Sequence, residues 1–232
     1  MDFAYIQKTS LIDYPENICS TIFTIGCNFK CPFCYNRTLV IPEEYPKNPL
    51  SNEQVLSTLF KRTHFVHAVC ITGGEPTVFD DLYDFIKSLK KEGFLVKLDT
   101  NGTNPKMIKR LIDDKLLDYV AVDIKNSQIK YAKTIGLESF DASKIKETVD
   151  LLRQNNISFE LRTTIVPTVH NIESIEEIGK WVGGGKFVIQ DFRRTNSLID
   201  PSLMNVIPFS QNELETFKKT AEKYFDKVEL RI

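Results

Sequence analysis

Six short apolar runs recur along the chain and alternate with amphipathic segments, and this alternation limits the possible folds most strongly. The runs occupy residues 20–25, 68–72, 95–100, 119–124, 159–166 and 186–192. They are almost continuously apolar and rich in β-branched residues, which is typical of strands buried on both faces of a parallel sheet. The segments between them have a helical period, with Ser51 and Pro105 as helix starts and Gly93 as a helix end.

Six strand-then-helix units in series predict an α/β protein with a wound parallel sheet and right-handed crossovers. A complete eight-unit barrel typically needs about 250 residues, whereas this chain has 232 residues. We therefore expect a partial (β/α)6, TIM-like barrel of parallel strands. No linker or internal repeat divides the sequence, so residues 1–232 are predicted to form a single domain. Its core spans about residues 18–192, followed by a C-terminal helix and strand within about 210–231.

Charge and hydropathy exclude several classes of protein. Thirty basic residues against thirty-one acidic residues leave a formal net charge of −1, so bulk charge indicates no nucleic-acid partner. No window approaches the roughly 18–20 apolar residues of a membrane span, and the N-terminus lacks a signal sequence. We expect a cytoplasmic protein without a membrane partner. In a reducing compartment, clustered cysteines are metal ligands or catalysts more often than disulfide partners.

Polar motifs follow the apolar runs closely. They are the cysteine cluster 27–34, "GGEP" (73–76), "DTNG" (99–102), "DIK" (123–125) and "IVPT" (165–168). Chemistry in wound parallel folds collects at the carboxyl ends of the strands, where these motifs would meet. The sequence therefore predicts one site at that end of the sheet.

Cys27, Cys31 and Cys34 have the spacing C-x-x-x-C-x-x-C. A closed zinc site needs a fourth ligand, and the remaining thiols and imidazoles are Cys19, Cys70, His64, His67 and His170. Cys19 and Cys70 fall in predicted strands, where a free cysteine is usually a small buried hydrophobe. An iron–sulfur cluster fits three thiolates better. With only three protein ligands, a four-iron cluster keeps one open position, as catalytic metals do.

The glycine pair Gly73–Gly74 permits close approach of backbone to a ligand. Glu75 adds an acceptor for a cationic amine, although "GGEP" alone also reads as an ordinary strand-to-helix turn. Asp99 lies in a strong turn sequence, since Asn-Gly is a turn dipeptide.

Three further charged residues belong to later strands. Asp123 is expected to face Asp99 across adjacent strand ends, which suits a hard cation or a hydroxyl-rich ligand; the alternative is a surface ion pair with Lys125. Arg162 lies inside an apolar run, where an unpaired charge is costly. It is expected to point into the barrel toward an anion, or else to form a structural ion pair.

With Phe33 as the aromatic residue, C-x-x-x-C-x-aromatic-C resembles the signature of the radical S-adenosylmethionine (SAM) superfamily. The resemblance implies that Cys27, Cys31 and Cys34 hold a [4Fe–4S] cluster. It also implies that the amino and carboxylate groups of SAM chelate the fourth iron. Residues Gly73, Gly74, Glu75 and Pro76 resemble the motif that binds the methionine amino group of SAM.

Residues 5–192 together resemble the activating enzymes of glycyl radical enzymes. They are most similar to anaerobic ribonucleoside-triphosphate reductase activating proteins of the longer, pyruvate formate-lyase-activase-like type. The resemblance implies that one electron cleaves SAM to methionine and a 5′-deoxyadenosyl radical, which removes hydrogen from a glycine of the partner. The implied partners are a glycyl radical enzyme, here the anaerobic ribonucleotide reductase, and reduced flavodoxin or ferredoxin as electron donor.

The same resemblance implies roles for individual residues. Asp13 and Tyr35 would contact the partner, and a monovalent cation would lie beside the SAM carboxylate. The residues implied at the cofactors are Phe33, Asp99, Thr100, Asn101, Asp123, Lys125, Arg162 and Gln190. The chain departs from related activases at "DYPE" (13–16), at Tyr35 where His is common, and at Phe192. These positions face the peptide in the family, so they bear on which glycyl radical enzyme is the partner.

The same motifs are compatible with three other functions. One alternative is a radical SAM enzyme with a small-molecule substrate, similar to 7-carboxy-7-deazaguanine synthase, and another is a pyruvate formate-lyase-type activase. A third is a non-enzymatic iron–sulfur electron carrier, for which "GGEP" and "DTNG" would have no use.

Overall fold

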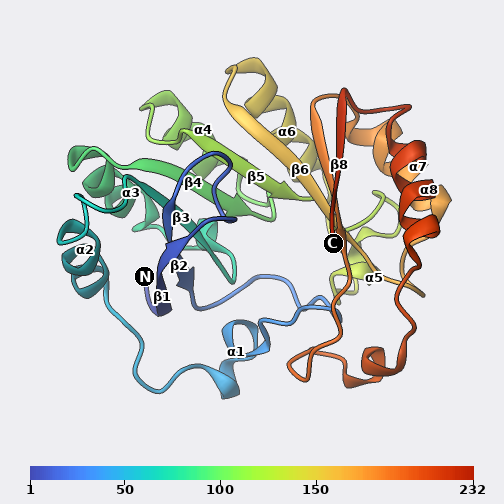
Figure 1. The fold of residues 1–232 in the computed structure, drawn as a ribbon, viewed down its shortest axis with the longest axis horizontal. Coiled ribbons are helices and arrows are strands. Elements are labelled where there is room, and N and C mark those ends of the chain that lie inside the picture. The colour runs from blue at the N-terminus through green and yellow to red at the C-terminus, as the bar shows by residue number, and fades with distance from the viewer.

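The computed structural model describes residues 1–232 and contains one curved eight-stranded sheet with the strands in chain order (Figure 1). The strands are β1 (Phe3–Ser10), β2 (Cys19–Thr24), β3 (Ala68–Gly73), β4 (Leu95–Thr100), β5 (Tyr119–Asp123), β6 (Ser158–Ile165), β7 (Lys186–Asp191) and β8 (Lys227–Arg231). Strands β2 to β8 pair in parallel, and β1 pairs with β2 in the antiparallel sense. Because β1 and β8 are edges that do not pair with each other, the barrel is open.

The longer helices cover the outside of the curved sheet (Figure 1). The helices are α1 (Arg37–Val40), α2 (Asn52–Phe60), α3 (Leu82–Lys91), α4 (Pro105–Asp113), α5 (Tyr131–Thr134), α6 (Ser143–Gln154), α7 (Ile172–Val182) and α8 (Gln211–Ala221). Short 3₁₀ turns are η1 (Pro42–Glu44), η2 (Pro76–Val78) and η3 (Pro201–Asn205). None of the helices has the length and apolar character needed to cross a bilayer.

Local sequence signals account for several helix ends. The predicted helix start at Ser51 is confirmed: its side chain accepts a hydrogen bond from the Gln54 amide, and the Gln54 side chain accepts one from the Ser51 amide, which makes a capping box. Pro105 is the first residue of α4. Gly93 follows α3 with a φ of +82°, a left-handed conformation that glycine adopts without strain.

The six predicted strands are confirmed as β2 to β7, within one or two residues at each end. The expected parallel arrangement is confirmed for β2 to β8, whereas β1, which was not predicted, runs antiparallel against β2. The strand expected near the C-terminus is β8, and it extends the sheet as a seventh parallel strand.

The two faces of the sheet differ in polarity. Its outer face packs against the helices through buried aliphatic residues such as Val69, Ile71 and Leu98. Its inner face carries charged residues, including the fully buried Lys97 and Glu160. Interiors of this kind of barrel are usually filled by branched apolar side chains. The polar interior of this barrel therefore indicates a binding site for a polar or charged ligand.

Candidate active site

A cavity of about 350 Å³ lies at the carboxyl ends of the parallel strands, inside the open barrel. The structure brings almost all of the predicted site residues to its wall. They are Asp13, Cys27, Cys31, Phe33, Cys34, Tyr35, Gly73, Gly74, Glu75, Asp99, Thr100, Asn101, Asp123, Lys125, Arg162 and Gln190. Pro76 is the exception, because it is buried as the first residue of η2. Residues at the five strands β3 to β7 and in the two loops on either side of β2 therefore form one site.

The three clustered cysteines are in the loop between β2 and α1, and all three line the cavity. Burial raises the pKa of Cys27 and of Cys31 to about 12. The thiols are therefore protonated at neutral pH, and a metal that binds them must displace their protons. Three thiols that line one cavity suit an iron–sulfur cluster, whose usual ligands are thiolates. Cys19 and Cys70 lie apart from this cavity as fully buried residues of the sheet interior.

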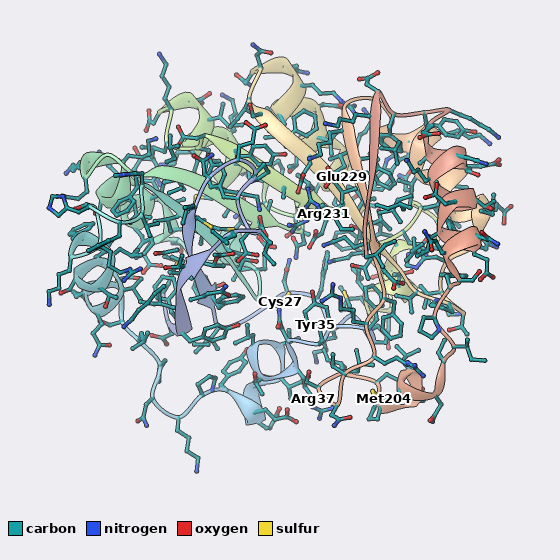
Figure 2. All side chains as sticks on the ribbon, viewed as in Figure 1. Cys27, Tyr35, Arg37, Met204, Glu229 and Arg231 are labelled. Carbon is teal, nitrogen blue, oxygen red and sulfur yellow. The ribbon has the colours of Figure 1, made fainter.

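A segment that follows β7, here called the strap (residues 193–200), holds the cysteine loop in place. Its hydrogen bonds run from Ile199 N to Cys34 O (3.1 Å), from Asp200 N to Pro32 O (2.9 Å) and from Ser197 Oγ to Tyr35 O (2.7 Å). Arg37 donates back to the Ile199 carbonyl at 3.1 Å. Figure 1 shows the strap beside the chain that leads into α1, and Figure 2 shows Cys27 and Tyr35 above Arg37 in the same region.

The glycine pair allows the turn after β3 to press against the start of the cysteine loop. Gly74 N donates to Thr24 O at 2.9 Å, and Glu75 N donates to Gly26 O at 2.8 Å. A Cβ atom on Gly74 would lie 1.9 Å from the Gly26 carbonyl oxygen. Only glycine at position 74 permits this approach.

The Glu75 carboxylate is 1% exposed and joins two motifs. Its Oε1 atom accepts hydrogen bonds from Thr77 N at 3.0 Å and from Thr100 Oγ1 at 2.7 Å. Its Oε2 atom accepts from Asn101 N at 2.6 Å. Burial raises the pKa of Glu75, while these donors oppose the rise. Glu75 therefore fixes the end of β4 against the turn after β3, and its predicted role as an amine acceptor stays a prediction.

Arg162 lies between the two predicted acidic residues. Its Nε atom donates to Asp123 Oδ1 at 2.9 Å, and its Nη1 atom donates to Asp99 Oδ2 at 3.0 Å. Lys125 donates to Asp123 Oδ2 at 3.0 Å. Burial alone would raise the pKa of Asp123, but Arg162 and Lys125 hold it well below its usual range. The two alternatives for these residues, an ion pair and a cavity wall, are both realised, because the paired groups also line the cavity.

His170 contacts the backbone of Lys125 through its imidazole ring. Its Nδ1 atom accepts from Val166 N at 3.0 Å, so the neutral ring carries its proton on Nε2, which lies 2.7 Å from the Lys125 carbonyl. The ring also packs edge-on against Phe33, with centroids 6.3 Å apart. Burial lowers the pKa of His170 to about 4. His64 and His67 are exposed, as expected of surface residues.

The comparisons with known proteins agree with this arrangement. Residues 21–182 match the family described as the radical SAM superfamily. The chain belongs to the radical SAM superfamily. Members use a [4Fe–4S] cluster and SAM, so membership implies both for this enzyme.

Two relatives of this radical SAM enzyme come from Methanocaldococcus jannaschii, and both are named as glycyl-radical enzyme activating enzymes. One is 37% identical, covering 97% of this chain and 94% of its own. The other is 26% identical, covering 97% of this chain and 85% of its own. A 7-carboxy-7-deazaguanine synthase from Thermococcus kodakarensis is 30% identical over 45% of this chain and 48% of its own.

Solved structures show the same fold. Streptococcus suis SuiB, determined with bound SAM, superposes with a TM-score of 0.68 at 13% identity. The alignment covers 90% of this chain and 51% of SuiB, so this radical SAM enzyme spans about half the length of that protein.

Several residues of this radical SAM site were not predicted from the sequence. Tyr5 from β1 and Phe23 from β2 stack with centroids 4.2 Å apart and form one cavity wall. Asn28 accepts from Asn101 Nδ2 at 2.7 Å, which ties the cysteine loop to β4. Asn28 lies between Cys27 and Cys31, so an amide inside the cysteine cluster was the available signal. Tyr5 had none, because the pairing of β1 was not predicted.

Proposed function

We propose that this radical SAM enzyme generates a glycyl radical on a partner enzyme, and that the partner is an anaerobic ribonucleoside-triphosphate reductase. The observation that carries the proposal is the relationship to the 37%-identical M. jannaschii protein, which extends over almost the full length of both chains. The resemblance of residues 5–192 to the reductase activating proteins supports the choice of partner.

Within this proposal, Cys27, Cys31 and Cys34 hold the cluster at the cavity wall. When bound, the cluster supplies the electron for reductive cleavage of SAM. Reduced flavodoxin or ferredoxin is the proposed source of that electron. Cys31 is buried, and the strap fixes backbone carbonyls of the loop.

The SAM-binding residues are proposed to be those on the opposite walls. The turn at Gly73–Gly74 brings backbone close to the methionine amino group, and Glu75 holds that turn against Asn101. Lys125 and Arg162 provide positive charge for the carboxylate. The enzyme's task is to position SAM and to exclude side reactions, since the cofactor carries the chemistry.

The mouth of the cavity is the proposed entrance for the partner's glycine segment. Tyr35 is 51% exposed yet lines the cavity. Asp13 also lines it and accepts a hydrogen bond from Thr21 Oγ1 at 2.7 Å, which fixes the carboxylate. Both residues can therefore contact a segment that enters from outside.

Anaerobic reconstitution with iron and sulfide, followed by reduction with SAM and the purified reductase, tests the function. We expect a glycyl radical doublet in the EPR spectrum of the reductase. A Cys31→Ser variant should give no doublet, and a Cys19→Ser variant should give the wild-type signal because Cys19 lies outside the cavity.

A small-molecule substrate is the competing outcome, because the chain also matches 7-carboxy-7-deazaguanine synthase over 45% of its length. Formation of 5′-deoxyadenosine with a pterin substrate, without any protein partner, would replace activation with that function. A doublet on pyruvate formate-lyase but not on the reductase would correct the partner alone.

A further inference from the structure

Asp99 and Asp123 lie at the ends of β4 and β5, and every oxygen of their two carboxylates lies beside a cationic side chain. Asp99 Oδ2 and Asp123 Oδ1 lie 3.0 Å and 2.9 Å from nitrogens of Arg162. Asp99 Oδ1 accepts from Lys97, and Asp123 Oδ2 lies 3.0 Å from Lys125 Nζ. The acidic pair is therefore enclosed by cations that belong to the protein.

The resemblance to activating enzymes implies a monovalent cation between these carboxylates and SAM, and the residues present do not fit one. Three protein cations against two carboxylates give this cluster a net charge of +1. A further cation would meet repulsion there. It would also need carboxylate oxygens that already accept hydrogen bonds, because alkali and alkaline-earth ions bind through oxygen.

The next charges on β6 to β8 do not reverse this balance. Glu160 is the nearest acidic residue along β6. Its carboxylate accepts a bidentate pair of hydrogen bonds from Arg231, from Nη1 to Oε1 at 2.8 Å and from Nη2 to Oε2 at 2.7 Å. Lys186 lies 3.1 Å from the same carboxylate. Glu160 is therefore paired with Arg231 and Lys186, and Arg162 pairs with Asp99 and Asp123. Figure 2 shows Arg231 on β8, above Tyr35 in this view.

One nitrogen of the Arg162 guanidinium, Nη2, has no hydrogen-bond partner in the protein. Nε and Nη1 are used for Asp123 and Asp99, whereas Nη2 donates to no protein group. Arg162 is 12% exposed, and its side chain lines the cavity. A planar guanidinium with two nitrogens fixed by carboxylates is rigid, and the third presents its N–H groups to a bound anion.

We infer that Arg162 is the built-in cation of this site: it binds the SAM carboxylate directly and takes the place of a bound monovalent metal ion. This inference rests on the proposed use of the cavity for SAM. Asp99 and Asp123 act as positioning residues that hold the guanidinium, with Lys97 and Lys125 completing the charge balance.

The test measures SAM binding to the cluster-reconstituted protein by anaerobic calorimetry in potassium, sodium or choline chloride at equal ionic strength. With screening held constant, we expect the wild-type dissociation constant to change by less than about twofold among the three salts. The melting temperature of the same protein should also be indifferent to the choice of salt. A saturable potassium or sodium effect on either quantity would overturn the inference.

Variants locate the effect at Arg162. Arg162→Ala should weaken SAM binding by at least about tenfold in choline, as expected for a lost charge-assisted hydrogen bond. It should then bind SAM at least about fivefold more tightly in potassium than in choline, because the emptied carboxylate pair can accept an ion. Arg162→Lys keeps a cation on the side chain and should stay indifferent to salt.

The matched control is Arg110→Gln, which removes one positive charge from the exposed face of α4 and should bind SAM as the wild type does. If Arg162→Ala does not fold, Arg162→Lys and the wild-type salt series still decide the question. Unchanged SAM binding by Arg162→Ala in choline would refute the assignment.

None of these measurements needs the partner protein. SAM binding that ignores potassium, together with failure to form a glycyl radical, would reject the proposed function and leave this inference standing. If a glycyl radical forms, but both its yield and the affinity of the enzyme for SAM require potassium, the proposed function stands and this inference is rejected.

Discussion

Replacement of Gly74 by alanine is expected to separate two segments that the site needs in contact. The added Cβ atom would lie 1.9 Å from Gly26 O, whereas real Cβ contacts shorter than 3.0 Å essentially never occur. The turn after β3 and the start of the cysteine loop must therefore move apart by at least 1.1 Å, the difference between these distances. Two backbone hydrogen bonds, of 2.9 Å and 2.8 Å, join the same segments and would break.

The cost follows from these contacts. Overpacking in a rigid environment costs about 1–3 kcal/mol, and each lost hydrogen bond adds about 1 kcal/mol or more when its groups stay buried. We expect Gly74→Ala to lower the free energy of unfolding by roughly 3–6 kcal/mol, a large fraction of the 5–15 kcal/mol that is typical of a domain. Iron incorporation should fall as well, because the cysteine loop begins at the displaced segment.

Urea denaturation of the apo-protein, followed by circular dichroism, measures the loss of stability. Gly93→Ala is the matched control: its φ of +82° makes alanine unfavourable, but nothing lies within 4 Å of the new Cβ. It should cost only about 1–2 kcal/mol and leave iron content unchanged. If Gly74→Ala loses no more stability than Gly93→Ala and loads iron normally, the close approach is not required.

Three more predictions concern single residues. Cys31→Ser should lower iron content and reduce SAM cleavage by at least about 100-fold; iron analysis and 5′-deoxyadenosine assays would show otherwise if Cys31 is not a ligand. The folded-state pKa of His170 is about 4, below the usual 6.5, so its contribution to stability is complete above pH 6.5 and is lost as the pH falls toward 4. Over that range the free energy of unfolding of the wild type should fall by about 3 kcal/mol more than that of His170→Gln. Urea titrations of the two proteins at each pH measure this, and an equal fall in both would contradict the prediction. Glu160→Gln leaves Arg231 and Lys186 without their shared carboxylate and should cost about 3–5 kcal/mol; calorimetry showing an unchanged melting temperature would refute the role of that carboxylate.

The sequence predicted most of the sheet because the information for β2 to β7 is local. Each of these strands is buried on both faces, so a continuous apolar run marks it. Strand β1 is different, since its exposure alternates and only its two ends are buried. Its place in the sheet depends on pairing with β2, which no short window of sequence contains.

The same distinction applies to the site. Motifs at strand ends could be assigned to one cavity because parallel strands bring their carboxyl ends together. What each charged side chain contacts there is set by the geometry of the barrel. Arg162 in an apolar run indicated a partner, but only the structure shows that it has two, Asp99 and Asp123. The strap lacks any periodic pattern, so its contact with the cysteine loop was not predictable.

The strap also sets an order of events during synthesis. Arg37 and the Ile199 carbonyl that it binds are 162 residues apart. At 5–20 residues per second, a ribosome delivers the cysteine loop roughly 8–30 seconds before the segment that fixes it. The carbonyls of Pro32 and Cys34 therefore leave the ribosome before the strap that binds them, and contacts of such long range form late in folding. Cluster insertion before the strap is synthesised would therefore meet a cysteine loop that lacks these contacts.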